Sequence, residues 1–271
     1  MNYSLFSCTI LSNGTLHRPA GLPVRQARGR LITFAPTHMP LSLSVVLPAY
    51  NEEANIETTV RELLAWMRQE GIDGEIIVTN DGSKDATGEI LRRMAQEIPI
   101  LKIVTHEVNK GYGSAVRSGL DRAAKEWIGY MDSDGQFKAS DFGKLLPYLG
   151  EYRIVTGRRR KRADPFMRKI NAKGFAFLNL VLLGIWVRDI NCAMKIFHRS
   201  IWQKIRPEFS TGALINAEIF YRARRNSIRW KQVFVEHYPR RFGAQTGANL
   251  KVILTMFRDM WRLRTTWCRS L

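Results

Sequence analysis

Cysteine is scarce in this chain, which has only Cys8, Cys192 and Cys268 among 271 residues. The three lie far apart and are odd in number, which excludes both a disulfide framework and a cysteine-based metal site. We therefore expect a reducing, cytoplasmic compartment. Long apolar runs are also lacking, and no stretch of eighteen or more residues has the uninterrupted hydrophobicity of a membrane-spanning helix.

Acidic residues are few relative to basic ones, with 24 Asp and Glu against 42 Lys and Arg and a net charge of +18. Such an excess indicates an anionic partner: nucleic acid, a phosphorylated substrate or an acidic membrane surface. Residues 1–40 contain no acid and no clear hydrophobic period, so we predict a basic, disordered N-terminal extension. The remaining length suits one large α/β domain over residues 41–249.

Hydrophobic runs that resemble buried strands alternate with amphipathic segments that resemble helices. This alternation with short loops predicts an α/β fold, with a mostly parallel sheet covered by helices on both faces. The expected strands are 43–47, 75–79, 100–105 and 127–131 in the first half, then 152–156, the loop and strand 188–195, and 232–236, with a helix at 215–225.

Polar clusters follow four of the predicted strands. They contain Tyr50 and Glu52, Asp81, Lys110, and the stretch Asp132–Gln136. Ligands of open α/β sheets bind at the carboxyl ends of the strands. The sequence therefore predicts one ligand site at this edge.

The stretch Asp132-Ser133-Asp134-Gly135-Gln136 is the strongest candidate for chemistry. In extended geometry residues i and i+2 point to the same face, so Asp132 and Asp134 can converge on one cation, with Gln136 adding a neutral oxygen. Oxygen ligands of this kind suit Mg²⁺ or Mn²⁺ bound together with substrate phosphates. The alternative is a surface turn, since Asp and Gly are ordinary turn residues.

Two basic segments of the sequence each allow two interpretations. The run Arg158–Arg162 is followed by a basic, strongly apolar segment that begins near Arg168. Residues 250–271 form a second basic pattern, which predicts an amphipathic C-terminal helix. Both patterns fit packing on the domain and burial in a membrane interface equally well.

Four motifs in this order resemble family 2 glycosyltransferases, in particular the branch that contains dolichyl-phosphate mannose synthase and bacterial polyprenyl-phosphate sugar transferases. They are Val46–Glu53, Asn80–Asp85, Asn109–Gly113 and Asp132–Gln136, extended by Arg188–Lys195 and His237–Arg240. The resemblance implies a GT-A-type fold with a nucleotide-sugar half at about 41–150 and an acceptor half at about 151–249.

The resemblance also implies roles for individual residues. The donor would be bound by Pro48, Tyr50, Glu52, Thr79, Asp81, Asp132, Ser133, Asp134, Arg158 and Arg240. Mg²⁺ or Mn²⁺ would be held by Asp132, Asp134 and Gln136, and the acceptor phosphate by Arg158 and Arg168. Asp134 and Asp189 would be catalytic, with Asp189 acting as a base or a positioning group.

The implied reaction is transfer of a mannose- or glucose-type sugar, with inversion, from GDP-mannose or UDP-glucose to a polyprenyl phosphate. It would take place at the cytoplasmic face of a membrane, through an interface helix or a membrane-embedded partner protein. One alternative places the sugar on a glycan or lipid hydroxyl, with Asp189 as a true general base. Binding of nucleic acid is disfavoured, because aromatic residues are not interleaved with the basic run.

Overall fold

The structure is a computed structural model that describes residues 40–160, 178–210 and 214–240, together with the single positions 174, 212, 260, 263 and 265. All of them belong to the unit Met39–Leu271. The predicted extension at 1–40 and the predicted helix at 250–271 lie almost entirely outside the described residues. Within the part that is described, no helix is both long enough and apolar enough to cross a bilayer.

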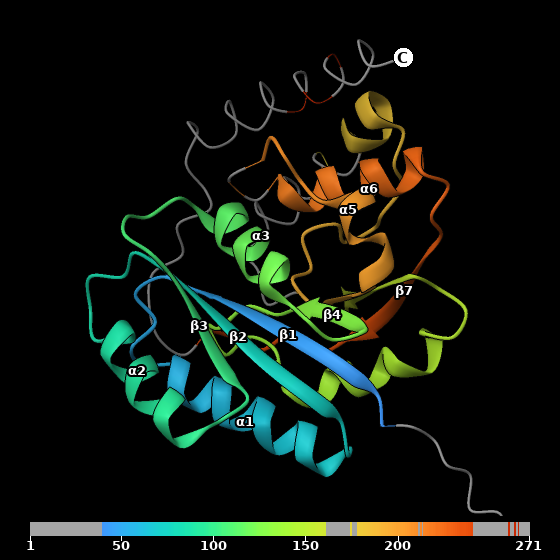
Figure 1. Ribbon diagram of the computed structural model, residues 1–271. Helices are drawn as coiled ribbons and strands as arrows, with labels where there is room; N and C mark the ends of the chain where they lie inside the picture. The colour runs from blue at the N-terminus through green and yellow to red at the C-terminus, as the bar shows by residue number, and fades with distance from the viewer. Residues whose placement is uncertain are drawn as a thin grey trace, which may run out of the picture. The chain divides into compact units, whose positions relative to one another are not determined.

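A seven-stranded sheet in the order β3-β2-β1-β4-β6-β5-β7 forms the centre of the domain (Figure 1). β1 pairs in parallel with β2 and β4, β2 with β3, and β5 with β7. β6 runs antiparallel to both of its neighbours, β4 and β5. The strands are β1 Ser42–Ala49, β2 Asp73–Asp81, β3 Leu101–His106, β4 Trp127–Tyr130, β5 Ile154–Arg159, β6 Lys195–His198 and β7 Trp230–Val235.

Helices cover both faces, with α1 and α2 on one face of β1–β3 and α3 on the other (Figure 1). The apolar positions of α1 recur every three or four residues, and Ile56, Val60 and Leu63 are fully buried, as an amphipathic helix requires. The helices are α1 Ile56–Gln69, α2 Thr87–Glu97, α3 Tyr112–Arg122, α5 Trp202–Ile205 and α6 Ile215–Arg225, with short 3₁₀ turns η1 Ala139–Lys144, η2 Leu146–Tyr148 and η4 Arg199–Ile201 and a π turn η3 Asn179–Leu183.

Helix α3 lies directly on the sheet because Gly119 has no side chain. A Cβ atom there would come within 2.3 Å of a Val46 methyl group and 2.8 Å of the Thr79 hydroxyl. Glycine at this position permits the close approach of helix and strands. The amino end of α3 is thereby held beside the carboxyl ends of β1, β2 and β4.

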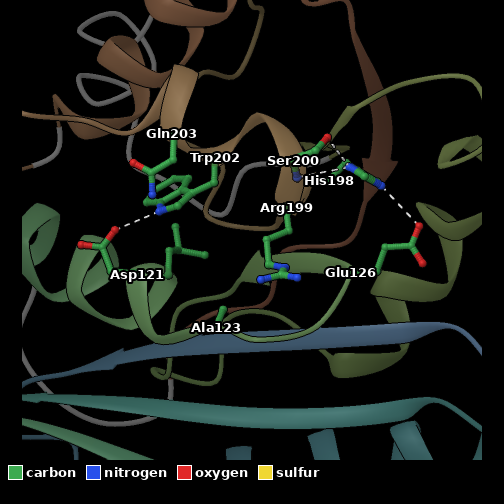
Figure 2. A pocket seen from close by; sticks show the side chains of 9 residues that line it. Asp121, Ala123, Glu126, His198, Arg199, Ser200, Trp202 and Gln203 are labelled. Carbon is green, nitrogen blue, oxygen red and sulfur yellow. Dashed lines mark hydrogen bonds and ion pairs between the residues drawn. The ribbon is translucent and has the colours of Figure 1, made fainter.

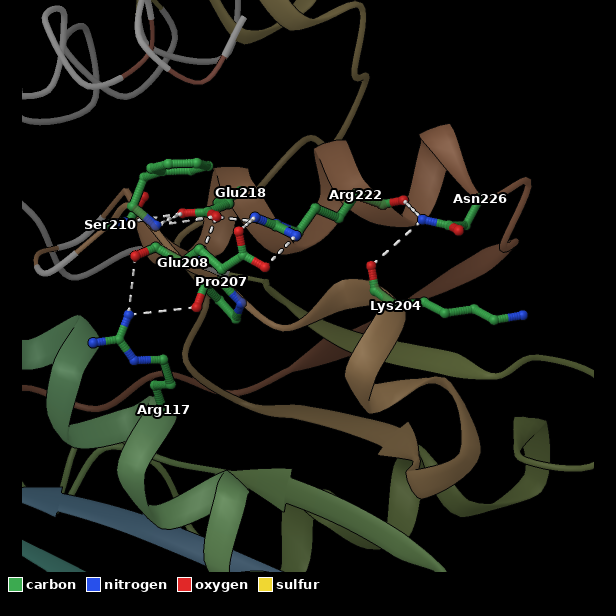
Figure 3. A network of polar contacts seen from close by, with 9 residues as sticks. Arg117, Lys204, Pro207, Glu208, Ser210, Glu218, Arg222 and Asn226 are labelled. Carbon is green, nitrogen blue, oxygen red and sulfur yellow. Dashed lines mark hydrogen bonds and ion pairs between the residues drawn. The ribbon is translucent and has the colours of Figure 1, made fainter. Parts of the chain in front are cut away.

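A buried ion pair on α6 fixes the chain segment that precedes this helix (Figure 3). The carboxylate of Glu218 is fully buried and accepts hydrogen bonds from the backbone amides of Glu208, Phe209 and Ser210, and from Arg222 at 3.0 Å. From α3, Arg117 reaches the Glu208 carbonyl at 3.3 Å. These bonds join α3 and α6 to the loop formed by residues 208–210.

The predicted mostly parallel sheet with helices on both faces is confirmed, and β6 is the strand that runs antiparallel to its neighbours within it. Two expectations need correction. The strand expected at 152–156 continues to Arg159, since its pairing with β7 extends through Arg159 and Val235. The strand expected within 188–195 only begins at Lys195, because the preceding residues form a turn in which the Cys192 amide donates to the Asp189 carbonyl.

Candidate active site

The loop after β4 holds the two carboxylates of the predicted cation site. β4 ends at Tyr130, so Asp132 and Asp134 lie in a loop rather than in extended strand. The loop folds back through Gly135, whose φ is +74°, and the Gln136 amide donates to Asp134 Oδ1 at 3.1 Å. Ser133 anchors the loop to β1 by donating to the Pro48 carbonyl at 2.7 Å. This turn replaces the extended geometry on which the predicted convergence was based.

The two carboxylates repel each other. Burial, and then the charge of Asp134, raise the pKa of Asp132 to about 7, although a hydrogen bond from Tyr112 and the charges of Lys195 and Arg159 act in the opposite direction. A divalent cation would favour the charged form of both carboxylates. The described residues contain no group of three or more acidic, His or Cys side chains that could hold a metal. Two carboxylates and the amide oxygen of Gln136 would leave coordination positions for diphosphate oxygens. The residues present fit such a cation.

Arg240 connects the two sides of this edge. Its guanidinium donates to Glu52, which follows β1, and lies 3.8 Å from Asp134 Oδ2. Burial raises the pKa of Glu52, while Asn55 and Arg240 act to lower it. Gln136 reaches the same segment, because its side-chain amide nitrogen donates to the Tyr238 carbonyl at 3.2 Å. The predicted donor residues Glu52, Asp134, Gln136 and Arg240 are thus brought together.

The residues expected at the base end of the nucleotide have different environments. The Tyr50 side chain is 42% exposed at the end of β1 and can meet a ligand. Thr79 and Asp81 are buried, Thr79 beneath Gly119 and Asp81 against the backbone amides of Lys110 and Gly111. Their contact with a nucleotide stays a prediction. A pocket of about 410 Å³ opens beside Glu52, between the loops that follow β1 and β2.

On β5 the structure separates two neighbouring arginines that the sequence presents as one basic run. Successive residues of a strand point to opposite faces. Arg158 lies over the Phe234 ring at 4.7 Å. Arg159 forms a bidentate pair with Asp189, at 2.8 Å from Nε and 2.7 Å from Nη2, and its backbone amide donates to the same carboxylate. Asp189 thus holds Arg159, which supports a positioning role over that of a base.

Comparison with known proteins identifies the family. The model described as glycosyl transferase family 2 matches residues 44–206, which is more than half of the chain. The chain belongs to glycosyl transferase family 2.

The curated relatives of this glycosyltransferase act on lipid phosphates. The undecaprenyl-phosphate 4-deoxy-4-formamido-L-arabinose transferase of Pectobacterium carotovorum is 30% identical over 235 residues, which cover 85% of this chain and 70% of the relative. The dolichyl-phosphate beta-glucosyltransferase of Drosophila melanogaster is 31% identical over 188 residues, covering 61% of this chain and 57% of the relative.

Solved structures confirm the predicted GT-A-type fold. Glucosyl-3-phosphoglycerate synthase from Mycobacterium tuberculosis, in complex with Mn²⁺, UDP and its product, has a TM-score of 0.62 and 22% identity over 82% of this chain and 78% of that one. Mannosyl-3-phosphoglycerate synthase from Rubrobacter xylanophilus has a TM-score of 0.64 and 17% identity, over 85% and 75%. At these identities the likeness concerns the fold.

Sequence reasoning missed several residues of this glycosyltransferase site. Arg159 has no assigned role in the sequence-based prediction because it lies within the basic run. The alternation of side chains along a strand would have distinguished it from Arg158. Lys195 is fully buried, and burial lowers the pKa of its amine to about 8. Its Nζ lies 5.3 Å from the centre of the Tyr130 ring and donates to the Ile190 carbonyl. Tyr112, which bonds Asp132, lay in a quoted motif without an assigned role. Arg168 lies outside the described residues.

A second pocket, of about 540 Å³, is separate from this site (Figure 2). Its lining includes Glu126, which precedes β4, and His198, which ends the antiparallel β6. Asp132 follows the opposite end of β4. This pocket therefore lies at the other edge of the sheet.

Proposed function

We propose that this glycosyltransferase moves a hexose from a nucleoside diphosphate donor to a polyprenyl phosphate at a membrane surface. The observation that carries the proposal is the arrangement at one sheet edge of two mutually repelling carboxylates and separate arginines. Asp132 and Asp134 suit a cation on a diphosphate, while Arg158 on β5 suits a second phosphate. The relatives that act on undecaprenyl and dolichyl phosphates support this acceptor class.

The donor would lie across the ends of β1, β2 and β4. Asp132, Asp134 and the amide oxygen of Gln136 would hold Mg²⁺ or Mn²⁺, which supplies Lewis-acid stabilisation of the departing diphosphate. Arg240 would shift between Glu52 and the phosphates, since it already contacts Glu52 and lies near Asp134. Tyr50 would offer its exposed ring to the nucleotide base.

The acceptor would approach from the side of β5 and β7. A phosphate is already anionic near neutral pH and needs no strong base for attack. This agrees with Asp189, whose carboxylate is occupied by Arg159. Arg158 would bind the acceptor phosphate, and attack opposite the leaving group would invert the anomeric centre.

Exposed apolar side chains support contact with a bilayer on this side. Trp186 is 58% and Phe234 46% exposed. Arg158 and Arg160 stack over Phe234, and the Arg188 amide donates to Gln232 on β7 at 3.2 Å, which places the segment after Trp186 beside that strand. Aromatic rings with neighbouring arginines are typical of surfaces that meet anionic lipid.

The test is transfer of labelled sugar into an organic-extractable product. Purified protein receives Mn²⁺ or Mg²⁺, a short polyprenyl phosphate, and GDP-mannose or UDP-glucose in parallel. We expect metal-dependent label in the lipid phase with one donor. Metal-dependent release of nucleoside diphosphate without a lipid product would refute the lipid-phosphate acceptor and favour a hydroxyl acceptor.

Membrane contact is tested separately by sedimentation with anionic vesicles. Trp186→Ser and Phe234→Ser should each lower the bound fraction, whereas Val108→Ser, which changes a side chain that is 64% exposed in the loop after β3, serves as the matched control. Equal binding of all three variants and the wild type would contradict this surface.

A further inference from the structure

The loops that follow β2 and β3 are locked together by Asp81. Its Oδ1 accepts from the Lys110 amide and its Oδ2 from the Gly111 amide, both at 2.9 Å. The next residue, Gly82, has a φ of +68°, and a Cβ atom there would come within 2.5 Å of the Val108 carbonyl carbon. The segment Val108–Gly111 therefore has little freedom to move relative to β2.

His106 supports Asp81 from behind. Its Nδ1 lies 2.6 Å from Asp81 Oδ1, and its Nε2 lies 2.9 Å from the Ser118 hydroxyl on α3. Because a carboxylate only accepts, Nδ1 is the donor in the first bond. His106 is 7% exposed and Asp81 2%, so water does not substitute easily for either bond. One imidazole thus joins β2, β3 and the middle of α3.

The segment Val108–Gly111 leads directly into α3, and the first residue of that helix faces the cation site. Gly111, with a φ of +92°, precedes the first helical residue, Tyr112. The Tyr112 hydroxyl in turn interacts with the Asp132 carboxylate. Hydrogen bonds therefore lead from Ser118 through His106 and Asp81 to Gly111, and the Tyr112 side chain continues the connection to Asp132.

We propose that His106 is a positioning residue of the cation site. It fixes Asp81, which fixes the Lys110–Tyr112 backbone, and through the Tyr112 hydroxyl it orients the Asp132 carboxylate toward the cation. This inference rests on the proposed function, because it takes Asp132 as a metal ligand. Groups that orient a ligand without touching the metal commonly change metal affinity by tenfold or more.

The first test measures Mn²⁺ binding by titration calorimetry, without donor or acceptor. We expect His106→Ala to raise the dissociation constant about tenfold, at the lower end of that range. His106→Asn should recover part of the loss, because its amide can still donate to Asp81. Ser118→Ala removes only the outer bond and should have a smaller effect. An unchanged constant for His106→Ala would overturn the proposal.

A matched control is available at the other edge of the sheet. His198 also has a hydroxyl on one ring nitrogen, Ser200 at 2.6 Å, and a carboxylate on the other, Glu126 at 3.3 Å. His198→Ala should leave the Mn²⁺ constant unchanged. An equal loss in both alanine variants would indicate general loosening of the fold and refute a specific role for His106.

The second test follows the segment itself by hydrogen exchange of the metal-free protein. The Lys110 and Gly111 amides should exchange faster in His106→Ala, with the core amides of β1 unchanged. If His106→Ala does not fold, the same two measurements are made on Ser118→Ala. Exchange rates and a Mn²⁺ affinity equal to those of the wild type in that variant would refute the proposal. Absence of sugar transfer by the wild type would overturn the proposed function without altering the order of these metal affinities.

Discussion

The pair formed by Asp189 and Arg159 allows the acceptor chemistry to be tested by mutation. Both side chains are nearly buried, with exposures of 7% and 10%, and three hydrogen bonds from Arg159 end on the one carboxylate. Asp189→Asn retains one neutral acceptor and loses the charge. Hydrogen bonds to charged groups contribute about 1.5–3 kcal/mol each. We therefore expect a loss of about 3 kcal/mol in kcat/KM, or roughly a hundredfold.

A double-mutant cycle distinguishes positioning from base catalysis. If Asp189 acts by holding Arg159, then Arg159→Met should cost about as much as Asp189→Asn, and the double variant no more than the worse single one. Arg159→Lys should recover little, because an ammonium group cannot form the bidentate pair. The assay is initial-rate transfer to a short polyprenyl phosphate. Additive losses, or a complete loss confined to Asp189→Asn, would refute the positioning argument.

Further predictions concern the cation site, the fold and the membrane. Asp134→Asn should abolish turnover with an unchanged circular dichroism spectrum, and near-normal activity would contradict the cation assignment. Glu218→Gln should destabilise the fold by about 3–5 kcal/mol in urea unfolding, because Arg222 would lose its buried partner. The control is Glu57→Gln on α1, because that partly exposed carboxylate is also paired with arginines. Burial lowers the pKa of Lys195 from 10.5 to about 8, so the unfolded chain binds a proton at this amine more tightly than the folded protein does. The free energy of unfolding of the wild type should therefore rise by up to about 3 kcal/mol relative to Lys195→Met between pH 8 and 10.5, and parallel curves would argue against the shift. Deleting residues 250–271 should weaken binding to anionic vesicles, and unchanged partition would exclude that segment as an anchor.

Much of the candidate site is predictable from the sequence, because its residues directly follow the ends of strands. The run Ser44–Leu47 and its successors have the continuous hydrophobicity of buried strands, and a parallel arrangement brings their exit loops to one edge. Asp132, Asp134 and Glu52 could therefore be placed together before any coordinates. Periodicity also located α1 and α6, the latter with its bounds at Ile215–Arg225.

Other parts depend on contacts between residues far apart in the chain. The antiparallel direction of β6 results from its pairing with β4 and β5 and has no signature in four residues. The pairing of Arg159 with Asp189 follows from the register of β5 and from the turn at 188–191.

The sequence by itself determined the family, the α/β architecture and the identity of the acidic edge, because these follow from local hydrophobic period and from short motifs in order. Only the tertiary structure decided which charges are already paired. Asp189 is held by Arg159, Glu52 by Arg240, and Asp81 by His106 and two backbone amides. The physical reason is that a carboxylate's role depends on the donors within about 3 Å of its oxygens, and those donors come from strands and loops that only folding brings together.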